Sequence, residues 1–131
     1  MSNCSRPLVT IVTASYNNIN RIFNTIYSIC MQDYPNIEFL LCDDASEEFN
    51  AEKIDSFICS NNNGCIVQYG IRHNETNLGT VKNLNIAYKE AKGTIIMPLS
   101  CGDCFIETDT VSKVVDRFLS TGCKVLATTM I

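Results

Sequence analysis

Two apolar segments that each end in polar residues constrain the fold of this 131-residue chain more than any other feature. Residues 8–14 read Leu-Val-Thr-Ile-Val-Thr-Ala and precede a Ser-Tyr pair, and residues 37–42 read Ile-Glu-Phe-Leu-Leu-Cys and precede an Asp-Asp pair. Nearly continuous apolar runs of this kind are typical of strands that a parallel sheet buries on both faces. Because ligands bind beyond the carboxyl ends of such strands, we expect the two polar pairs to line one crevice.

Strand-like and helix-like segments alternate along the whole chain, which favours crossover connections and a mainly parallel sheet. We expect strands at 8–14, 37–42, 66–71, 94–99 and within 124–131. We expect helices from after Asn18 or Asn20 up to Pro35, from after Asn50 up to Asn61, over 80–91, and from Thr108 or Asp109 to Gly122. The predicted fold class is therefore α/β, with about five strands and helices on both faces of the sheet. Gly93, after the third helix, is expected to act as a left-handed terminator.

Length and charge narrow the classes of function. The chain is long enough for one domain, residues 1–131, with a buried core. The net charge is −4 and no stretch is rich in Lys or Arg, which argues against a nucleic-acid surface. The amino terminus has no signal pattern, and no apolar run approaches the roughly 20 residues that span a bilayer. We therefore expect no membrane segment and a cytoplasmic location.

The eight cysteines are interpreted as free, structural side chains. Four of them lie in apolar strand or helix segments, where a free cysteine behaves as a small hydrophobic residue: Cys30, Cys42, Cys59 and Cys123. Cys101 and Cys104 have CxxC spacing, but no second pair follows at matching spacing. We interpret that spacing as accidental, because one CxxC alone is weak evidence for a metal or redox site.

Four ordered motifs resemble the glycosyltransferase family 2 domain and cover the chain from about residue 7 to its end. They are Ser15-Tyr16-Asn17, Gln32-Asp33-Tyr34-Pro35-Asn36-Ile37-Glu38 with Asp43-Asp44-Ala45-Ser46, Asn77-Leu-Gly-Thr-Val-Lys-Asn83, which contains the family's Asn-x-Gly, and residues 93–103, which stand where the family has an Asp-x-Asp strand. The resemblance implies a Rossmann-like GT-A fold. It also implies an inverting transfer of a sugar from a nucleotide-diphosphate sugar to an acceptor hydroxyl.

The resemblance further implies that this chain is the amino-terminal, donor-binding portion of a longer catalytic domain. In the family the acceptor site and the general base follow in a second half, so the base would lie beyond residue 131 and the chain alone would bind nucleotide without transferring sugar. The acceptor would be a glycan or a lipid-linked glycan, in cell-envelope polysaccharide biosynthesis. The full protein would be cytoplasmic, at the inner face of the membrane.

The resemblance assigns roles to the donor-site residues. Asp44 would accept the N–H of a pyrimidine base, a UDP-sugar being the default donor with guanine and thymine left open. Tyr16 would stack on or border the base, and Ala14 would approach the ligand with backbone atoms. The residues expected to contact the nucleotide are Ala14, Tyr16, Asp43, Asp44, Lys82 and Ser100.

Plainer interpretations of these residues stay open. The Asp-Asp-Ala-Ser segment is also compatible with an ordinary turn and helix cap. Lys82 could neutralise a phosphate held at the amino terminus of the third helix, or it could be a solvated side chain. His73 follows the third predicted strand, and we expect it to be solvated.

The metal motif departs from the family pattern. Transferases of this type usually hold Mg²⁺ or Mn²⁺ through Asp-x-Asp, because hard cations prefer oxygen ligands and bridge the two phosphates. Ser100, Cys101 and Gly102 stand in the matching positions, and Asp103 comes directly after them. We expect Asp103 to serve as the single protein ligand, with phosphate oxygens and waters completing the coordination, and the metal dependence to be uncertain.

Two alternatives from other classes of function remain at this stage. A non-catalytic nucleotide-binding module would keep the donor pocket and lose transfer chemistry, which the Ser-Cys-Gly-Asp segment allows. A phosphoacceptor receiver domain also has alternating α/β segments and paired aspartates. The receiver fits poorly, because here the acidic pair follows the second strand and Lys124 precedes the fifth.

Overall fold

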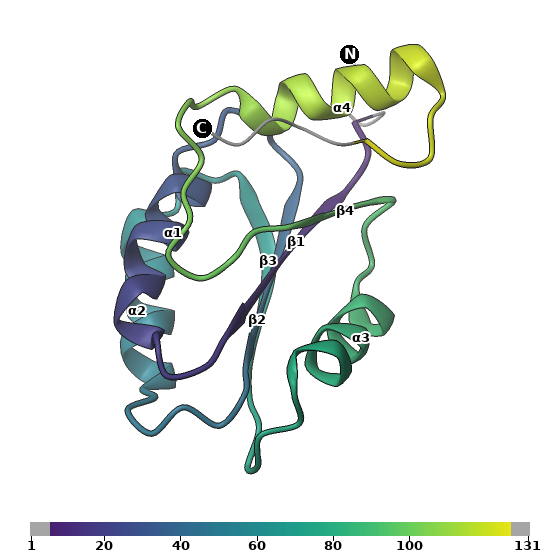
Figure 1. Cartoon of the computed structure of the whole chain (residues 1–131). Coiled ribbons are helices and arrows are strands. Elements are labelled where there is room, and N and C mark those ends of the chain that lie inside the picture. Colours follow the sequence, from purple (N-terminus) through teal and green to yellow (C-terminus); the bar gives the residue numbers. More distant parts are fainter. Residues whose placement is uncertain (1–5, 127–131) are drawn as a thin grey trace.

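The computed structural model describes residues 6–126 and shows a four-stranded parallel sheet with helices on both of its faces (Figure 1). The strands are β1 (Val9–Ser15), β2 (Ile37–Asp43), β3 (Ile66–His73) and β4 (Ile95–Pro98), and they lie in the order β3-β2-β1-β4. All three neighbouring pairs are parallel. The α/β prediction is confirmed. Most of the strand predicted within 124–131 lies outside the described residues, and residues 124–126 are not in a strand.

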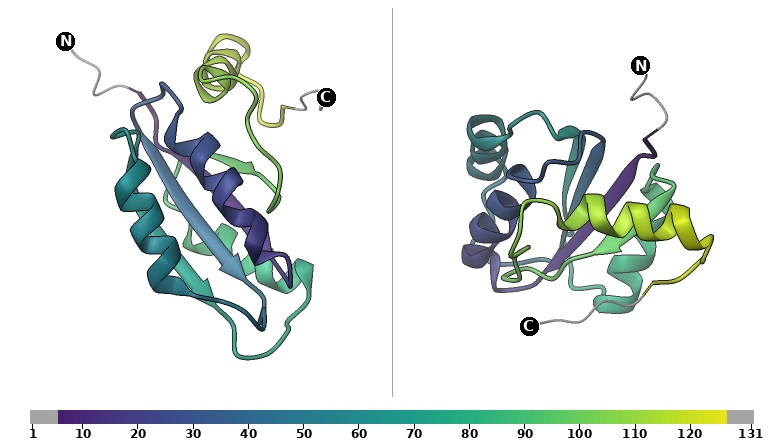
Figure 2. Two further views of the ribbon diagram at one scale, coloured as in Figure 1. Left: turned by 90° about the vertical axis from the view of Figure 1, so that its left-hand side faces the viewer. Right: turned by 90° about the horizontal axis from the view of Figure 1, so that it is seen from above.

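The connections between strands explain which face each helix covers. The helices are a short 3-10 helix (Ile19–Arg21), α1 (Ile22–Cys30), α2 (Ala51–Asn61), α3 (Thr80–Glu90) and α4 (Thr110–Thr121). Crossovers between parallel strands are right-handed, so α1 and α2, which lead from β1 to β2 and β3, lie side by side on one face. The path from β3 back to β4 runs the other way and places α3 on the opposite face, while α4 lies across the amino ends of the strands (Figures 1 and 2).

Strand β1 is covered on both faces, which accounts for its nearly continuous apolar sequence. Ile11 and Phe39 belong to the larger core under α1 and α2, and Val12 packs with Cys42 and Ala87 under α3. The α3 contact is the narrower of the two, since only Asn83 and Ala87 of that helix are buried.

The apolar spacing along the helices predicts that Tyr27, Val81 and Leu119 lie on buried faces, but their exposed fractions are 50%, 72% and 62%. Each helix contacts its neighbours over a narrower stripe than the apolar pattern suggested. Helix α2 begins after Asn50, as predicted, and the Asn50 side chain caps it by accepting a hydrogen bond from the Lys53 N–H at 3.1 Å.

A buried carboxylate ties the strands together toward their amino ends. Glu38 of β2 accepts hydrogen bonds from Thr10 Oγ1 at 2.6 Å, Gln68 Nε2 at 2.8 Å and the Lys92 N–H at 2.8 Å. Burial alone would raise the pKa of this carboxyl, but these hydrogen bonds and the charge of Lys92 outweigh it and hold the pKa below the ordinary value. Glu38 therefore joins β1, β2, β3 and the segment that leads into β4 through one ionised group.

Gly93 is required for a reason other than the predicted one. A left-handed terminator has a positive φ angle, and Gly93 does not have one. The glycines that do are Gly64, Gly79, Gly102 and Gly122. A Cβ at position 93 would instead lie 2.5 Å from Thr10 Oγ1, 2.6 Å from Thr10 N and 2.9 Å from Leu8 O. The backbone before β4 thus approaches β1 too closely for any side chain.

We predict that Gly93→Ala lowers the free energy of unfolding by about 2–3 kcal/mol, because backbone atoms of β1 would have to move. The matched control is Gly70→Ala, where the new Cβ would meet only the Leu40 Cδ2 at 3.4 Å. This control should change the free energy by less than about 1 kcal/mol. Urea denaturation of both variants measures the difference, and equal losses would contradict the close-approach explanation.

Candidate functional site

A pocket of about 200 Å³ opens at the carboxyl ends of β1 and β4, on the α3 side of the sheet. It is lined by Val12, Ala14, Ser15, Tyr16, Asp44, Thr80, Asn83, Leu84, Pro98, Leu99 and Ser100. Strand order reverses between β1 and β4, since β2 and β3 follow on one side of β1 and β4 lies on the other. This is the position at which open α/β sheets bind ligands, and it matches the crevice expected from the sequence.

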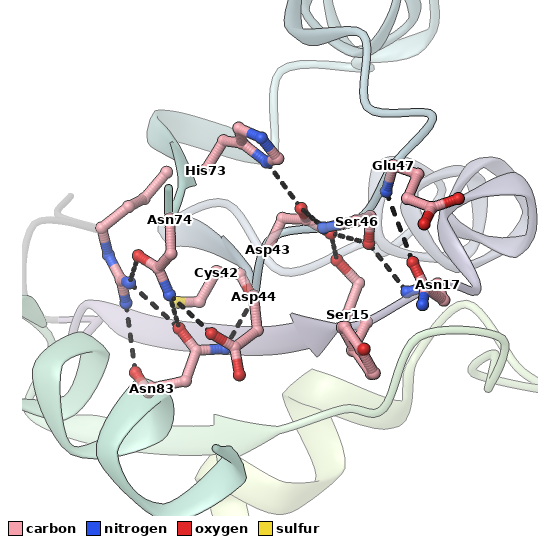
Figure 3. A network of polar contacts seen from close by, with 12 residues as sticks. Ser15, Asn17, Cys42, Asp43, Asp44, Ser46, Glu47, His73, Asn74 and Asn83 are labelled. Atoms are coloured by element: carbon pink, nitrogen blue, oxygen red, sulfur yellow. Dashed lines mark hydrogen bonds and ion pairs between the residues drawn. The ribbon is translucent and has the colours of Figure 1, made fainter. Parts of the chain in front are cut away.

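Asp43 lies behind the pocket and is fully buried (Figure 3). Its Oδ1 accepts hydrogen bonds from Ser15 Oγ at 2.6 Å and Ser46 Oγ at 2.5 Å. Its Oδ2 accepts the Ser46 N–H at 2.9 Å and lies 2.7 Å from His73 Nδ1. Because a carboxylate offers about four acceptor positions, no position is left for a nucleotide. The predicted contact between Asp43 and the ligand is therefore not supported, and its geometry is that of a residue that positions others.

Asp44, the next residue, points the other way and lines the pocket. Its Oδ1 accepts hydrogen bonds from the Leu78 N–H at 2.7 Å and Asn74 Nδ2 at 3.1 Å, and its Oδ2 accepts the Gly79 N–H at 2.9 Å. Three of about four acceptor positions are thus filled. One position on Oδ2 remains for a donor from a ligand.

The loop hydrogen bonds also keep Asp44 ionised. Burial acts to raise the pKa of this carboxyl, but the hydrogen bonds from Leu78, Asn74 and Gly79 and the charge of Arg72 outweigh it. The pKa is therefore held below its ordinary value of 3.8. A carboxylate in this state accepts a strong hydrogen bond from a neutral N–H donor.

Arg72 and two asparagines hold the Asp44 loop in place. Arg72 Nη1 donates to Asn74 Oδ1 at 2.6 Å and to Asn83 Oδ1 at 3.0 Å. Asn83 Nδ2 donates in turn to the Cys42 carbonyl of β2 at 2.9 Å. No role in holding this loop was predicted for Asn74 or for Asn83. Asn83 carried a detectable signal, because it is a polar residue one helical turn before Ala87 on the buried stripe of α3.

The remaining predicted residues divide between the pocket and its surroundings. Ala14, Tyr16 and Ser100 line the pocket with Asp44, and Tyr16 is 52% exposed. Lys82 is exposed in the first turn of α3 but is not among the lining residues. Asp103 lies in the turn after β4, where its N–H donates to the Ser100 carbonyl at 2.9 Å.

His73 is less solvated than expected. Its ring stacks on Phe49 with centroids 4.4 Å apart, and its Nδ1 faces Asp43. Its side chain remains 39% exposed. His73 therefore joins the end of β3 to the buried carboxylate and lies outside the pocket wall.

The residues after β4 do not fit the metal site that the resemblance implies. Within residues 6–126, no three His, Cys, Asp or Glu side chains come together in a way that could hold a metal ion. Asp103 is the one carboxylate in the segment 100–104. Cys101 is buried, which raises the pKa of its thiol to about 11, so this thiol is protonated at neutral pH.

The seven cysteines in the described part of the chain are free, in agreement with the reduced interpretation. Cys30, Cys42, Cys65 and Cys101 are buried, whereas Cys59 is exposed, contrary to its expected place in the core. No helix within residues 6–126 is long and apolar enough to cross a membrane.

Comparison with known proteins agrees with the motifs. The profile of the family described as "Glycosyl transferase family 2" matches residues 10–130. The Escherichia coli protein UDP-Glc:alpha-D-GlcNAc-diphosphoundecaprenol beta-1,3-glucosyltransferase WfaP is 35% identical over 106 residues, which are 77% of this chain and 38% of WfaP. The chain thus spans well under half the length of this curated relative.

Two solved structures share the fold. TarS from S. aureus in complex with UDP superimposes with a TM-score of 0.74 at 21% identity, over 88% of this chain and 33% of that chain. The mannosyltransferase PcManGT from Pyrobaculum calidifontis, in complex with GDP-Man and Mn²⁺, gives a TM-score of 0.76 at 23% identity, over 86% of this chain and 32% of that chain. At these identities the structural similarity establishes the GT-A fold. It does not establish which ligand this chain binds.

The receiver alternative is not supported. Receivers have the strand order 2-1-3-4-5, whereas β4 and not β3 lies beside β1 here. Asp43 is also saturated with hydrogen bonds and fully buried, so it could not accept a phosphoryl group.

We predict that Asp43→Asn lowers the free energy of unfolding by about 3 kcal/mol, because an amide NH₂ would face donors that now need an acceptor. The control is Asp116→Asn, whose carboxylate makes a surface ion pair with Arg6 and is 67% exposed. This control should cost less than about 1 kcal/mol. Urea denaturation at neutral pH measures both, and similar small losses would disprove the central role of Asp43.

We also predict a specific acid sensitivity. Since the folded-state pKa of Asp44 lies below 3.8, its ionised form stabilises the fold fully above that pH, and this stabilisation is lost as the pH falls through the folded pKa. Asp44→Asn should be less stable at neutral pH and should lose less stability between about pH 5 and pH 2.5. Denaturation midpoints across this range test the prediction, and parallel curves for variant and wild type would refute it.

Proposed function

The chain belongs to glycosyl transferase family 2, and from that membership we propose that residues 1–131 form the donor-binding portion of an inverting glycosyltransferase. The reaction transfers a sugar from a nucleotide-diphosphate sugar to an acceptor hydroxyl. The relatives found are themselves named as glycosyltransferases or solved as such, which favours a transferase over a non-catalytic binding module.

One observation carries this proposal: the ionised carboxylate of Asp44 borders the pocket beside Tyr16 and keeps an acceptor position on Oδ2. A uracil N–H would donate to that oxygen, and the exposed ring of Tyr16 would stack on the base. Ala14 would border the base with backbone atoms. The Leu78 and Gly79 amides, which fix the carboxylate from behind, would preorganise it for this contact.

The relatives support a nucleotide donor of this class. WfaP is named for UDP-Glc as donor, TarS was solved with UDP and PcManGT with GDP-Man. We take UDP as the default nucleotide. The acceptor in WfaP's name is linked to diphosphoundecaprenol, which supports a lipid-linked glycan as the acceptor here, in cell-envelope polysaccharide synthesis at the cytoplasmic face of a membrane.

The diphosphate would leave the base pocket past Ser100, where β4 ends, and near the free N–H groups at the start of α3. Lys82 would add charge from the first turn of that helix. The sequence predicts Mg²⁺ or Mn²⁺ on Asp103, and the Mn²⁺ bound to PcManGT supports a divalent ion in related enzymes. The donor set of this chain, with one carboxylate in place of two, does not fit that site, so no step is assigned to a metal.

We predict that Tyr16→Ala weakens binding of both UDP and uridine by about tenfold or more, since base stacking contributes roughly 1–3 kcal/mol. Tyr27→Ala is the matched control, because Tyr27 is equally exposed but lies on α1 away from the pocket. Calorimetric titration gives both affinities. Equal effects of the two substitutions would contradict the placement of the base.

Asp44→Ala should abolish the dependence of affinity on the base, so that uridine no longer binds measurably. Because this substitution also releases the Leu78 and Gly79 amides, the fold of the variant is checked by its thermal transition. Unchanged uridine affinity in a folded Asp44→Ala variant would defeat the proposed function.

A further inference from the structure

An exposed arginine stands beside the segment that lacks the metal-binding carboxylates. Arg21 ends the 3-10 helix that precedes α1, and its side chain runs along Gly102. A Cβ placed on Gly102 would lie 3.2 Å from Arg21 Cδ, 3.6 Å from its Cβ and 3.8 Å from its Nη1. Arg21 therefore occupies the space into which a side chain at position 102, such as the second aspartate of Asp-x-Asp, would project.

Hydrogen bonds hold this juxtaposition in place. The segment after β4 runs along α1 (Figure 1), with the Gly102 N–H donating to Thr25 Oγ1 at 2.8 Å and the Phe105 N–H donating to Ser28 Oγ at 3.1 Å. Cys101 Sγ donates to the Asn18 carbonyl at 3.3 Å. Gly102 itself has a φ of 101°, which favours glycine. The contact between Arg21 and position 102 thus belongs to a fixed part of the fold.

The charge of Arg21 is available to a ligand. None of the ion pairs among residues 6–126 involves Arg21, whereas Arg72 is paired with Glu90 at 3.6 Å and bonded to Asn74 and Asn83. Ser100 lines the pocket and lies two positions before Gly102 along the chain, a span of at most about 7 Å. A diphosphate that passes Ser100 would therefore come within reach of the guanidinium.

A diphosphate needs positive charge in a protein whose own net charge is −4. We propose that the guanidinium of Arg21 binds the donor diphosphate in place of the divalent cation that Asp-x-Asp would hold. This proposal explains two observations together. Both carboxylates of the motif are missing, and an arginine without an ion pair among residues 6–126 lies beside position 102. This inference rests on the proposed function, since it concerns the same nucleotide.

The chemistry of arginine suits this role. Its guanidinium stays protonated across the physiological range and presents parallel N–H donors that match two oxygens of a phosphate. A carboxylate at position 102 would pair with that guanidinium and compete with the phosphate. Glycine at this position leaves the guanidinium free to meet the ligand.

The test titrates uridine and UDP into the wild-type chain, Arg21→Ala and Arg21→Lys, each in EDTA and in Mn²⁺. Arg117→Ala is the matched control, because it removes the same charge from an exposed site on α4. In EDTA, Arg21→Ala should weaken UDP at least about tenfold, the contribution of one charge-assisted hydrogen bond, and leave uridine unchanged. Arg21→Lys should retain part of the UDP affinity.

The result that overturns the inference is an Arg21→Ala variant whose UDP affinity matches that of Arg117→Ala. A gain of about tenfold or more from Mn²⁺ in the wild type that Asp103→Ala abolishes would also overturn it, because the metal would then carry the charge. The proposed function fails differently: uridine would not bind the wild type at all, or Tyr16→Ala would have no effect on it.

Discussion

The carboxylate of Asp43 is the interaction on which the ligand-binding edge of this sheet depends. It joins Ser15 at the end of β1, Ser46 in the following turn and His73 at the end of β3 through four short contacts in a fully buried position. Buried charge is costly unless every acceptor is satisfied. Here each acceptor position is filled by a different structural element or group, so the carboxylate fixes where three chain segments end.

The pleat of β2 gives its two terminal aspartates opposite tasks. Successive side chains point to opposite faces of a strand, so Asp43 enters the core on the α1 side and Asp44 faces the pocket on the α3 side. The first is saturated and the second keeps one acceptor position. The loop that binds the Asp44 carboxylate is itself fixed by hydrogen bonds among Arg72, Asn74 and Asn83. The fixed sheet edge therefore holds a preorganised hydrogen-bond acceptor at the pocket, where we propose that the base binds.

The sequence predicts most of the fold because its signals are local. The apolar run of β1, the start of α2 after Asn50 and the end of β4 follow from patterns of a few residues. The role of Gly93 could not be predicted in this way, since it depends on the approach of Thr10 and Leu8 from a distant segment. The same holds for Asp43: alternation predicts its burial, but its saturation requires knowing that residues 15, 46 and 73 converge on it. The position of Arg21 beside Gly102 could not be predicted either, because the two residues are about eighty positions apart along the chain.

The path of the segment after β4 has a consequence for how this site can diverge among homologues. Its backbone is anchored to hydroxyl groups of Thr25 and Ser28, which belong to a helix outside the pocket. Exchanges at these two positions would shift the backbone beside Ser100, where we propose that the diphosphate lies, while every pocket-lining residue stayed the same. Substrate preference can therefore drift through sequence changes that an inspection of the pocket lining alone would overlook.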